Sequence, residues 1–136
     1  MTSKVSENRG KLIFFVDDDK MILNLLEYTF RSKDDYEVKT FRSGEECIAA
    51  MNENPDIVVL DHVFSKEGED LISGLETLKK LRKLGHNLPI IMLSNQEDKD
   101  LIPEFIKHGA FRYIAKDSFF IDSLIEAIEL AMTKVN

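Results

Sequence analysis

The sequence has little of what defines disulfide-stabilised, membrane-spanning or nucleic-acid-binding proteins. Its single cysteine, Cys47, excludes a disulfide bond within the chain and favours a reducing compartment, so we expect a cytoplasmic protein. No apolar run approaches the roughly 20 residues that a membrane-spanning helix requires. The net charge of −7 argues against nucleic acid as a partner, because that binding needs a basic surface. An acidic chain suits cations or basic partner surfaces instead.

The length and composition are those of one domain. The chain has 136 residues, of which 43% are hydrophobic, and this is enough to build one continuous core. Residues 1–10 are polar and lack an apolar centre, so we predict a short flexible leader and no signal peptide. We predict the domain itself at residues 11–136, and we expect no output domain after its last helix.

Short apolar runs alternate with longer segments of helical periodicity. Four such runs predict strands, at residues 12–16, 57–60, 89–93 and 111–115. The first three are apolar nearly throughout, as strands covered on both faces should be. Residues 36–41 alternate between apolar and polar side chains, which indicates an edge strand. Helical patterns separate these strands. The alternation predicts an α/β fold, with a parallel sheet and helices on both of its faces.

Three helix boundaries can be predicted from local chemistry. Ser43 and Glu46 have the spacing of a capping box, in which each side chain bonds to the other residue's backbone N–H. A proline inside the fourth helical segment restricts that helix to about residues 101–108. Asp117 or Ser118 is the expected N-cap of the last helix.

Polar side chains follow the predicted strands at the points where the strands end. Asp17–Asp19 follow the first strand and Asp61 follows the third, while Ser94 and Lys116 follow the fourth and fifth. Ligands of open parallel sheets bind outside the carboxyl ends of the strands. We therefore expect these carboxylates, the hydroxyl and the ammonium to form one cluster.

The acidic residues predict a metal site. Asp17, Asp18 and Asp61 would lie close together, and a cation would relieve the repulsion between their charges. Oxygen ligands of this kind, few in number, point to Mg²⁺. The alternative is that Asp17–Asp19 only cap the first helix, where acidic side chains suit the helix dipole.

Asp61 is the predicted nucleophile of this cluster. A carboxylate can attack phosphorus and form an acyl phosphate. Phosphoryl transfer chiefly requires in-line placement and positive charge on the phosphoryl oxygens. Lys116 can supply part of that charge, and Ser94 can donate a hydrogen bond to another oxygen. Each of these two residues alone has an ordinary alternative role, as a solvated lysine or a turn serine.

Taken together, these motifs resemble those of response-regulator receiver domains, including the single-domain chemotaxis regulators, over about residues 11–132. The resemblance implies a flavodoxin-like, doubly wound sheet of five parallel strands in the order 2-1-3-4-5. It also implies the roles of individual residues: the phosphoacceptor Asp61, the lysine Lys116, the switch hydroxyl Ser94, the switch aromatic Tyr113, and the Mg²⁺ ligands Asp18, Asp61, the backbone carbonyl of Val63, and Asp17 directly or through water.

The resemblance further implies a function in a two-component phosphorelay. A sensor histidine kinase or a histidine phosphotransfer protein would donate the phosphoryl group to Asp61. Ser94 would then turn toward that group and vacate space for Tyr113. This remodels the face formed by the fourth helix, fifth strand and fifth helix, which would bind a downstream protein or a second copy of the chain. Such a domain loses its phosphoryl group by itself and is not a turnover enzyme.

The sequence also bears on three other functions. A Mg²⁺-dependent phosphatase with an aspartyl nucleophile usually has a second aspartate two residues later, where this chain has Val63. A pseudo-receiver that docks constitutively would not need the complete set of acceptor residues. A flavodoxin-type flavin protein would need a phosphate-binding loop after the first strand, and the sequence has none there.

The chain departs from the receiver pattern in three places. The segment between Asp61 and the next helix, residues 62–73, is long. It either shapes partner choice or covers the site, or it is a tolerated surface insertion. Asp117 follows Lys116 where the family usually has proline, and a cis bond before a non-proline residue costs about 2.5–4 kcal/mol, which favours a trans bond. Lys20 stands where the family often has proline.

Overall fold

A computed structural model describes residues 10–33, 35–62 and 72–134. Within these residues one parallel sheet has the strand order β2-β1-β3-β4-β5, so the predicted fold and strand order are confirmed. Every strand lies close to its predicted position: β1 Lys11–Val16, β2 Tyr36–Phe41, β3 Ile57–Asp61, β4 Ile90–Ser94 and β5 Arg112–Ala115.

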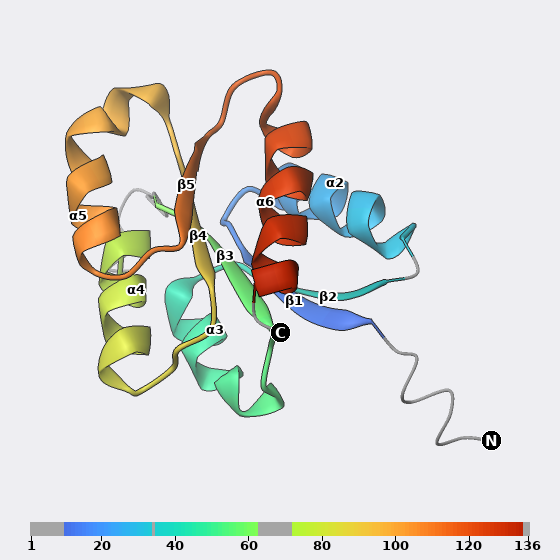
Figure 1. The fold of residues 1–136 in the computed structure, drawn as a ribbon, viewed down its shortest axis with the longest axis horizontal. Coiled ribbons are helices and arrows are strands. Elements are labelled where there is room, and N and C mark those ends of the chain that lie inside the picture. Colours follow the sequence, from blue (N-terminus) through green and yellow to red (C-terminus); the bar gives the residue numbers. More distant parts are fainter. Residues whose placement is uncertain (1–9, 34, 63–71, 135–136) are drawn as a thin grey trace.

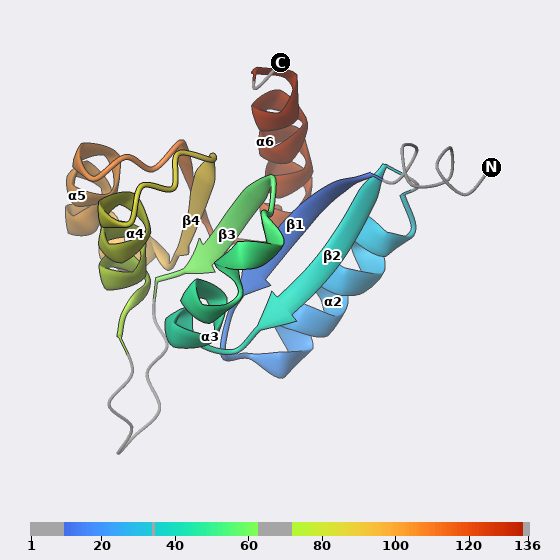
Figure 2. The same cartoon turned by 90° about the horizontal axis from the view of Figure 1, so that it is seen from below.

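Helices cover both faces of the sheet (Figure 1). α2 (Lys20–Arg31) and α6 (Phe120–Lys134) lie on one face, while α3 (Gly44–Ala49), α4 (Gly74–Lys83) and α5 (Ile102–Lys107) lie on the other, as Figure 2 also shows. Two short 3-10 helices, at Met51–Glu53 and Gln96–Leu101, were not predicted. Among the described helices, none has both the length and the apolar composition needed to span a bilayer.

The central strands contribute side chains to two separate cores. In β1, Ile13 and Phe15 pack under α2 and α6, while Phe14 and Val16 pack under α3, α4 and α5. Successive side chains of a strand point to opposite faces, so a strand covered on both sides must be apolar throughout. This is why the apolar runs identified the central strands correctly.

Two helix boundaries test the sequence predictions. α5 spans Ile102–Lys107, as predicted from the proline, which occupies its first turn. The predicted start of α6 differs from the structure, because the helix begins at Phe120, later than an N-cap at Asp117 or Ser118 implies. Asp117 Oδ1 instead accepts a hydrogen bond of 2.9 Å from Phe119 N, in the turn before the helix.

The predicted capping box at α3 forms only in part. Ser43 accepts a hydrogen bond from Glu46 N, but the Glu46 carboxylate accepts from Arg42 N and not from Ser43 N. The complete reciprocal box lies at the start of α4, between Ser73 and Glu76. That box has the same sequence spacing, so it was predictable and was missed.

Candidate functional site

The strand register aligns the polar residues at the carboxyl edge of the sheet. Val16 pairs with Leu60, so Asp17 and Asp61 are the next residues of two adjacent strands. On the other side of β3, Asp61 pairs with Leu93, and Ser94 follows directly. Because Ser94 pairs with Ala115, Lys116 is the next residue beyond the edge of β5. Parallel pairing therefore brings four separate segments to one edge.

Three carboxylates form a compact cluster there. One oxygen each from Asp17, Asp18 and Asp61 lie within 4.8 Å of one another. The side chains of Asp17 and Asp61 are buried, with 1% and 4% of their residue surface exposed. Lys116 Nζ lies 2.7 Å from Asp61 Oδ1 and 3.0 Å from Asp17 Oδ2. The structure thus brings together the acidic residues and the ammonium that the sequence singled out.

The backbone holds Lys116 in this position. Its N–H donates a hydrogen bond of 2.8 Å to the carbonyl of Ser94, which continues the pairing of β4 with β5 past the end of β5. Among the described residues all peptide bonds are trans, and this includes the bond between Lys116 and Asp117. Lys116 therefore reaches Asp61 without the cis bond that proline would favour. Ser94 itself is buried at the end of β4.

The electrostatics of the cluster favour an additional cation. Burial, together with the negative charge of Asp17, raises the pKa of Asp61 from 3.8 to about 7, although Lys116 acts in the opposite direction. Burial also raises the pKa of Asp17, against the stabilising effects of the Asp19 N–H and Lys116. For Lys116, burial lowers the pKa, but Asp61 and Asp17 outweigh it and the net shift is upward. One ammonium does not compensate three carboxylates.

The donor set fits Mg²⁺. Hard carboxylate oxygens in small number are the ligands this ion prefers, and its remaining positions are filled by water or phosphate oxygens. Asp17, Asp18 and Asp61 can supply such oxygens from one cluster. Val63, whose backbone carbonyl is the further predicted ligand, lies outside the described residues. That ligand therefore remains a prediction.

The aspartates after β1 divide between two tasks. Asp19 is the N-cap of α2, and its carboxylate accepts hydrogen bonds from Met21 N and Ile22 N. Asp17 turns toward the cluster, and its Oδ1 accepts a hydrogen bond of 2.9 Å from Asp19 N. The helix-capping alternative is therefore right for Asp19, while Asp17 and Asp18 belong to the acidic cluster.

Gly74 is a site-shaping residue that the sequence reasoning missed. A Cβ atom added there would lie 2.2 Å from the backbone carbonyl oxygen of Asp61, so no larger residue fits without a shift. The Gly74 N–H also donates a hydrogen bond of 2.9 Å to the carbonyl of His62. Gly74 is the first residue of α4 and directly follows the N-cap Ser73. A glycine at that position could have indicated that another backbone segment packs closely against it.

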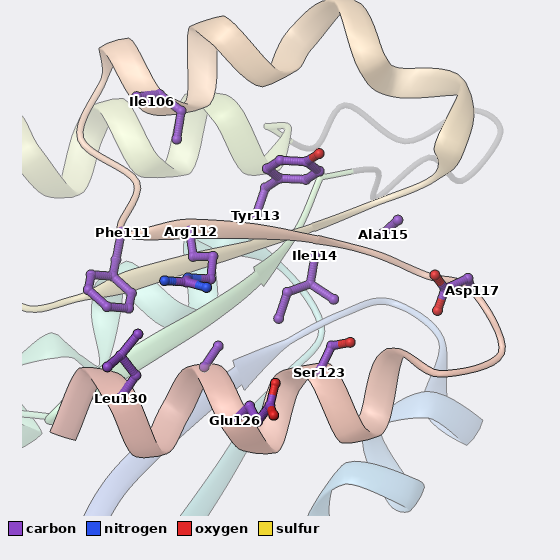
Figure 3. A pocket seen from close by; sticks show the side chains of 11 residues that line it. Ile106, Phe111, Arg112, Tyr113, Ile114, Ala115, Asp117, Ser123, Glu126 and Leu130 are labelled. Atoms are coloured by element: carbon purple, nitrogen blue, oxygen red, sulfur yellow. The ribbon is translucent and has the colours of Figure 1, made fainter. Parts of the chain in front are cut away.

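Tyr113 lies on β5, and 38% of its surface is exposed. It lines a groove of about 790 Å³ between α5, β5 and α6 (Figure 3). Ile106 of α5 lies on one side of this groove, and Glu126 and Leu130 of α6 lie on the other. Ser94 on β4 and Tyr113 on β5 lie on adjacent, paired strands, and the surface beside Tyr113 is open.

The fold and the residues at its carboxyl edge define a class of protein. The chain matches the model of the response regulator receiver domain family over residues 13–129, and it belongs to that family.

Two curated relatives show how far the similarity extends. The chain is 36% identical, over 108 residues, to the alkaline phosphatase synthesis transcriptional regulatory protein PhoP of Bacillus subtilis, covering 79% of this chain and 42% of that protein. It is 32% identical, over 119 residues, to a nitrate/nitrite response regulator protein homolog of Haemophilus influenzae. That match covers 86% of this chain and 54% of that protein. The chain thus spans about half the length of these relatives.

Solved structures show the same fold. The receiver domain of the Francisella response regulator 1452 matches with a TM-score of 0.81 and 26% identity, covering 93% of this chain and all of that one. The receiver domain of NtrX from Brucella abortus matches with a TM-score of 0.77 and 30% identity, covering 89% of this chain and 98% of that one. Receiver domains are in general signalling domains and not turnover enzymes.

Proposed function

We propose that this domain accepts a phosphoryl group on Asp61 from a phosphohistidine of a sensor histidine kinase or a histidine phosphotransfer protein. An Asp61 carboxylate oxygen attacks phosphorus, the P–N bond to the donor histidine breaks, and an acyl phosphate forms. The observation that carries the proposal is the 2.7 Å contact of Lys116 Nζ with Asp61 Oδ1, inside a cluster of three carboxylates.

Each residue of the cluster has a part in this step. Lys116 orients the Asp61 carboxylate and carries positive charge to the place where the phosphoryl oxygens will lie. Asp17, Asp18 and Asp61 would hold Mg²⁺, which when bound supplies further positive charge to those oxygens. Burial of Asp17 and Asp61 excludes water from the nucleophile and strengthens these interactions.

Signal output would pass from Ser94 to Tyr113. The hydroxyl of Ser94 turns to donate a hydrogen bond to the new phosphoryl group. Tyr113 then moves inward from its half-exposed position and changes the shape of the groove between α5, β5 and α6. A downstream protein, or a second copy of this chain, reads that change. The support for this step is the adjacency of the two strands and the open groove beside Tyr113.

An exposed apolar surface near the acidic cluster suits the docking of the phosphoryl donor. Met21, Leu25 and Tyr28 have helical i, i+4, i+7 spacing on α2, and their surfaces are 80%, 46% and 77% exposed. α2 starts directly after Asp19, so this stripe begins beside the carboxylates. Phe119, 70% exposed, directly precedes α6, the helix that covers the same face of the sheet as α2. A helical donor can cover such a stripe while its histidine reaches Asp61.

Intact-mass spectrometry tests the proposal. After incubation with acetyl phosphate and Mg²⁺, the protein should gain the mass of one phosphoryl group, and chelator should prevent the gain. Asp61→Asn should not be labelled, because an amide is not a nucleophile toward phosphorus. Asp122→Asn, the same change at an exposed position on α6, is the matched control and should label normally. Equal labelling of Asp61→Asn would refute the assignment. Steady turnover of a phosphomonoester would favour the phosphatase alternative.

A further inference from the structure

A second groove is lined by residues from α3, α4 and their flanking positions. The two helices cover the face of the sheet opposite α2 and α6 (Figure 2). The groove measures about 520 Å³ and is lined by Glu45, Ile48, Ala49, Ile72, Lys80, Lys83 and Leu84; we call it the α3–α4 groove. The two helices approach closely at one end, where a Cβ on Gly44 would lie 1.9 Å from Thr77 Oγ1. None of its lining residues takes part in the phosphoryl-transfer step proposed above.

The floor of this groove is apolar and accessible. Leu84, one of its lining residues, is 61% exposed. Ile48 and Ile72 are only partly buried beside it. Three aliphatic side chains that share one concave surface can receive an apolar anchor from another molecule, which single exposed apolar residues cannot.

The rim of the groove is basic on an otherwise acidic protein. The net charge of the chain is −7, yet α4 carries four basic residues, Lys79, Lys80, Arg82 and Lys83, against one acidic residue, Glu76. Arg82 turns inward and donates hydrogen bonds to three backbone carbonyls. Lys80 and Lys83 line the groove, and within the described part of the chain neither forms an ion pair.

Lysines in the last turn of a helix also suit the helix dipole, so charge alone does not define a binding surface. The dipole does not explain the apolar floor between them. The acidic member of the groove, Glu45, has a partner of its own, since its carboxylate accepts a hydrogen bond of 3.1 Å from Ile72 N. The lining of the groove carries two lysines and one glutamate, so its net charge is positive.

We propose that the α3–α4 groove binds an acidic peptide segment of a partner protein, with an apolar side chain seated against Ile48, Ile72 and Leu84 and carboxylates facing Lys80 and Lys83. Apolar contact supplies the anchor, while the rim charges attract acidic segments and repel basic ones. The proposal does not depend on phosphoryl transfer, so Asp61→Asn should bind the segment as the unmodified chain does.

The test uses a fluorescein-labelled peptide of about 12 residues, in which leucine and phenylalanine are flanked by aspartate and glutamate. Fluorescence anisotropy measures its affinity for the full chain, and methyl NMR shifts of Ile48, Ile72 and Leu84 locate the contact. Lys83→Glu should weaken binding about tenfold, because it reverses a charge at the rim. Lys79→Glu makes the same change on the same helix outside the groove, and should alter affinity by less than about twofold.

Several outcomes would overturn the proposal. These are the absence of shifts at the three methyl-bearing residues, equal weakening by Lys79→Glu, or undiminished binding of a peptide with serine in place of its apolar residues. Sedimentation of the chain alone tests a second copy as the occupant. A dimer that Leu84→Gln dissociates would assign the groove to self-association and not to an acidic partner. Loss of peptide binding in Leu84→Gln, with the chain monomeric throughout, would support the proposal.

Discussion

Replacing Asp61 by asparagine should stabilise the metal-free protein, even though it removes the proposed nucleophile. Burial and the charge of Asp17 raise the pKa of Asp61 from 3.8 to about 7. Ionising this carboxylate therefore costs the folded state up to about 4 kcal/mol, at about 1.4 kcal/mol per pH unit. Asparagine carries no charge, and its side-chain oxygen can still accept the hydrogen bond from Lys116.

The stabilisation should depend on pH with a defined sign. Below pH 3.8 the carboxyl group is protonated in both states, so the substitution removes no charge. Between pH 3.8 and about 7 the folded state keeps a proton that the unfolded state has lost, so the stability of the unmodified chain falls as pH rises. The advantage of Asp61→Asn should therefore grow by about 2–3 kcal/mol between about pH 5 and pH 8.

Urea unfolding followed by circular dichroism, in the presence of chelator and at several pH values, measures this difference. Asp122→Asn is the control, because it makes the same change at an exposed position outside the carboxylate cluster. Saturating Mg²⁺ should stabilise the unmodified chain and narrow the gap, since a cation relieves the same repulsion. If Asp61→Asn is less stable than the unmodified chain near pH 8, or if the gap does not change with pH, the electrostatic reasoning is wrong.

Two further predictions concern packing away from the site. Cys47 is fully buried, and burial raises the pKa of its thiol from 9.0 to about 12. A disulfide reagent should therefore modify this thiol only as fast as the protein unfolds. Rapid reaction of the folded protein would contradict this prediction. The same shift should lower stability as pH rises from 9.0 toward 12, measured by urea unfolding, because only the unfolded thiol loses its proton there. Gly44→Ala should cost about 1–3 kcal/mol in urea unfolding, because its Cβ would lie 1.9 Å from Thr77 Oγ1. Gly85→Ala, where φ is +93° and the space is open, should cost only about 1 kcal/mol in the same measurement. If Gly44→Ala costs no more than Gly85→Ala, then α3 and α4 separate easily at Gly44.

Much of the fold could be predicted from periodicity and topology. The strands of the central sheet are apolar on both faces, and that pattern depends only on which side chains must be buried. The clustering of Asp61 with Lys116 could also be anticipated, because the carboxyl ends of parallel strands meet at one edge. Local rules were less successful at the start of α6, where Asp117 forms a turn hydrogen bond and the helix begins three residues later.

The sequence by itself determined which segments become strands and helices, and which polar residues stand where the strands end, because both depend on the order of side chains along the chain. Only the tertiary structure decided that Asp17 faces Lys116, and that Asp61 is buried deeply enough to raise its pKa to about 7. The α3–α4 groove likewise exists only once two helices pack together. Distances and burial arise from contacts between segments far apart in sequence, and no local pattern contains them.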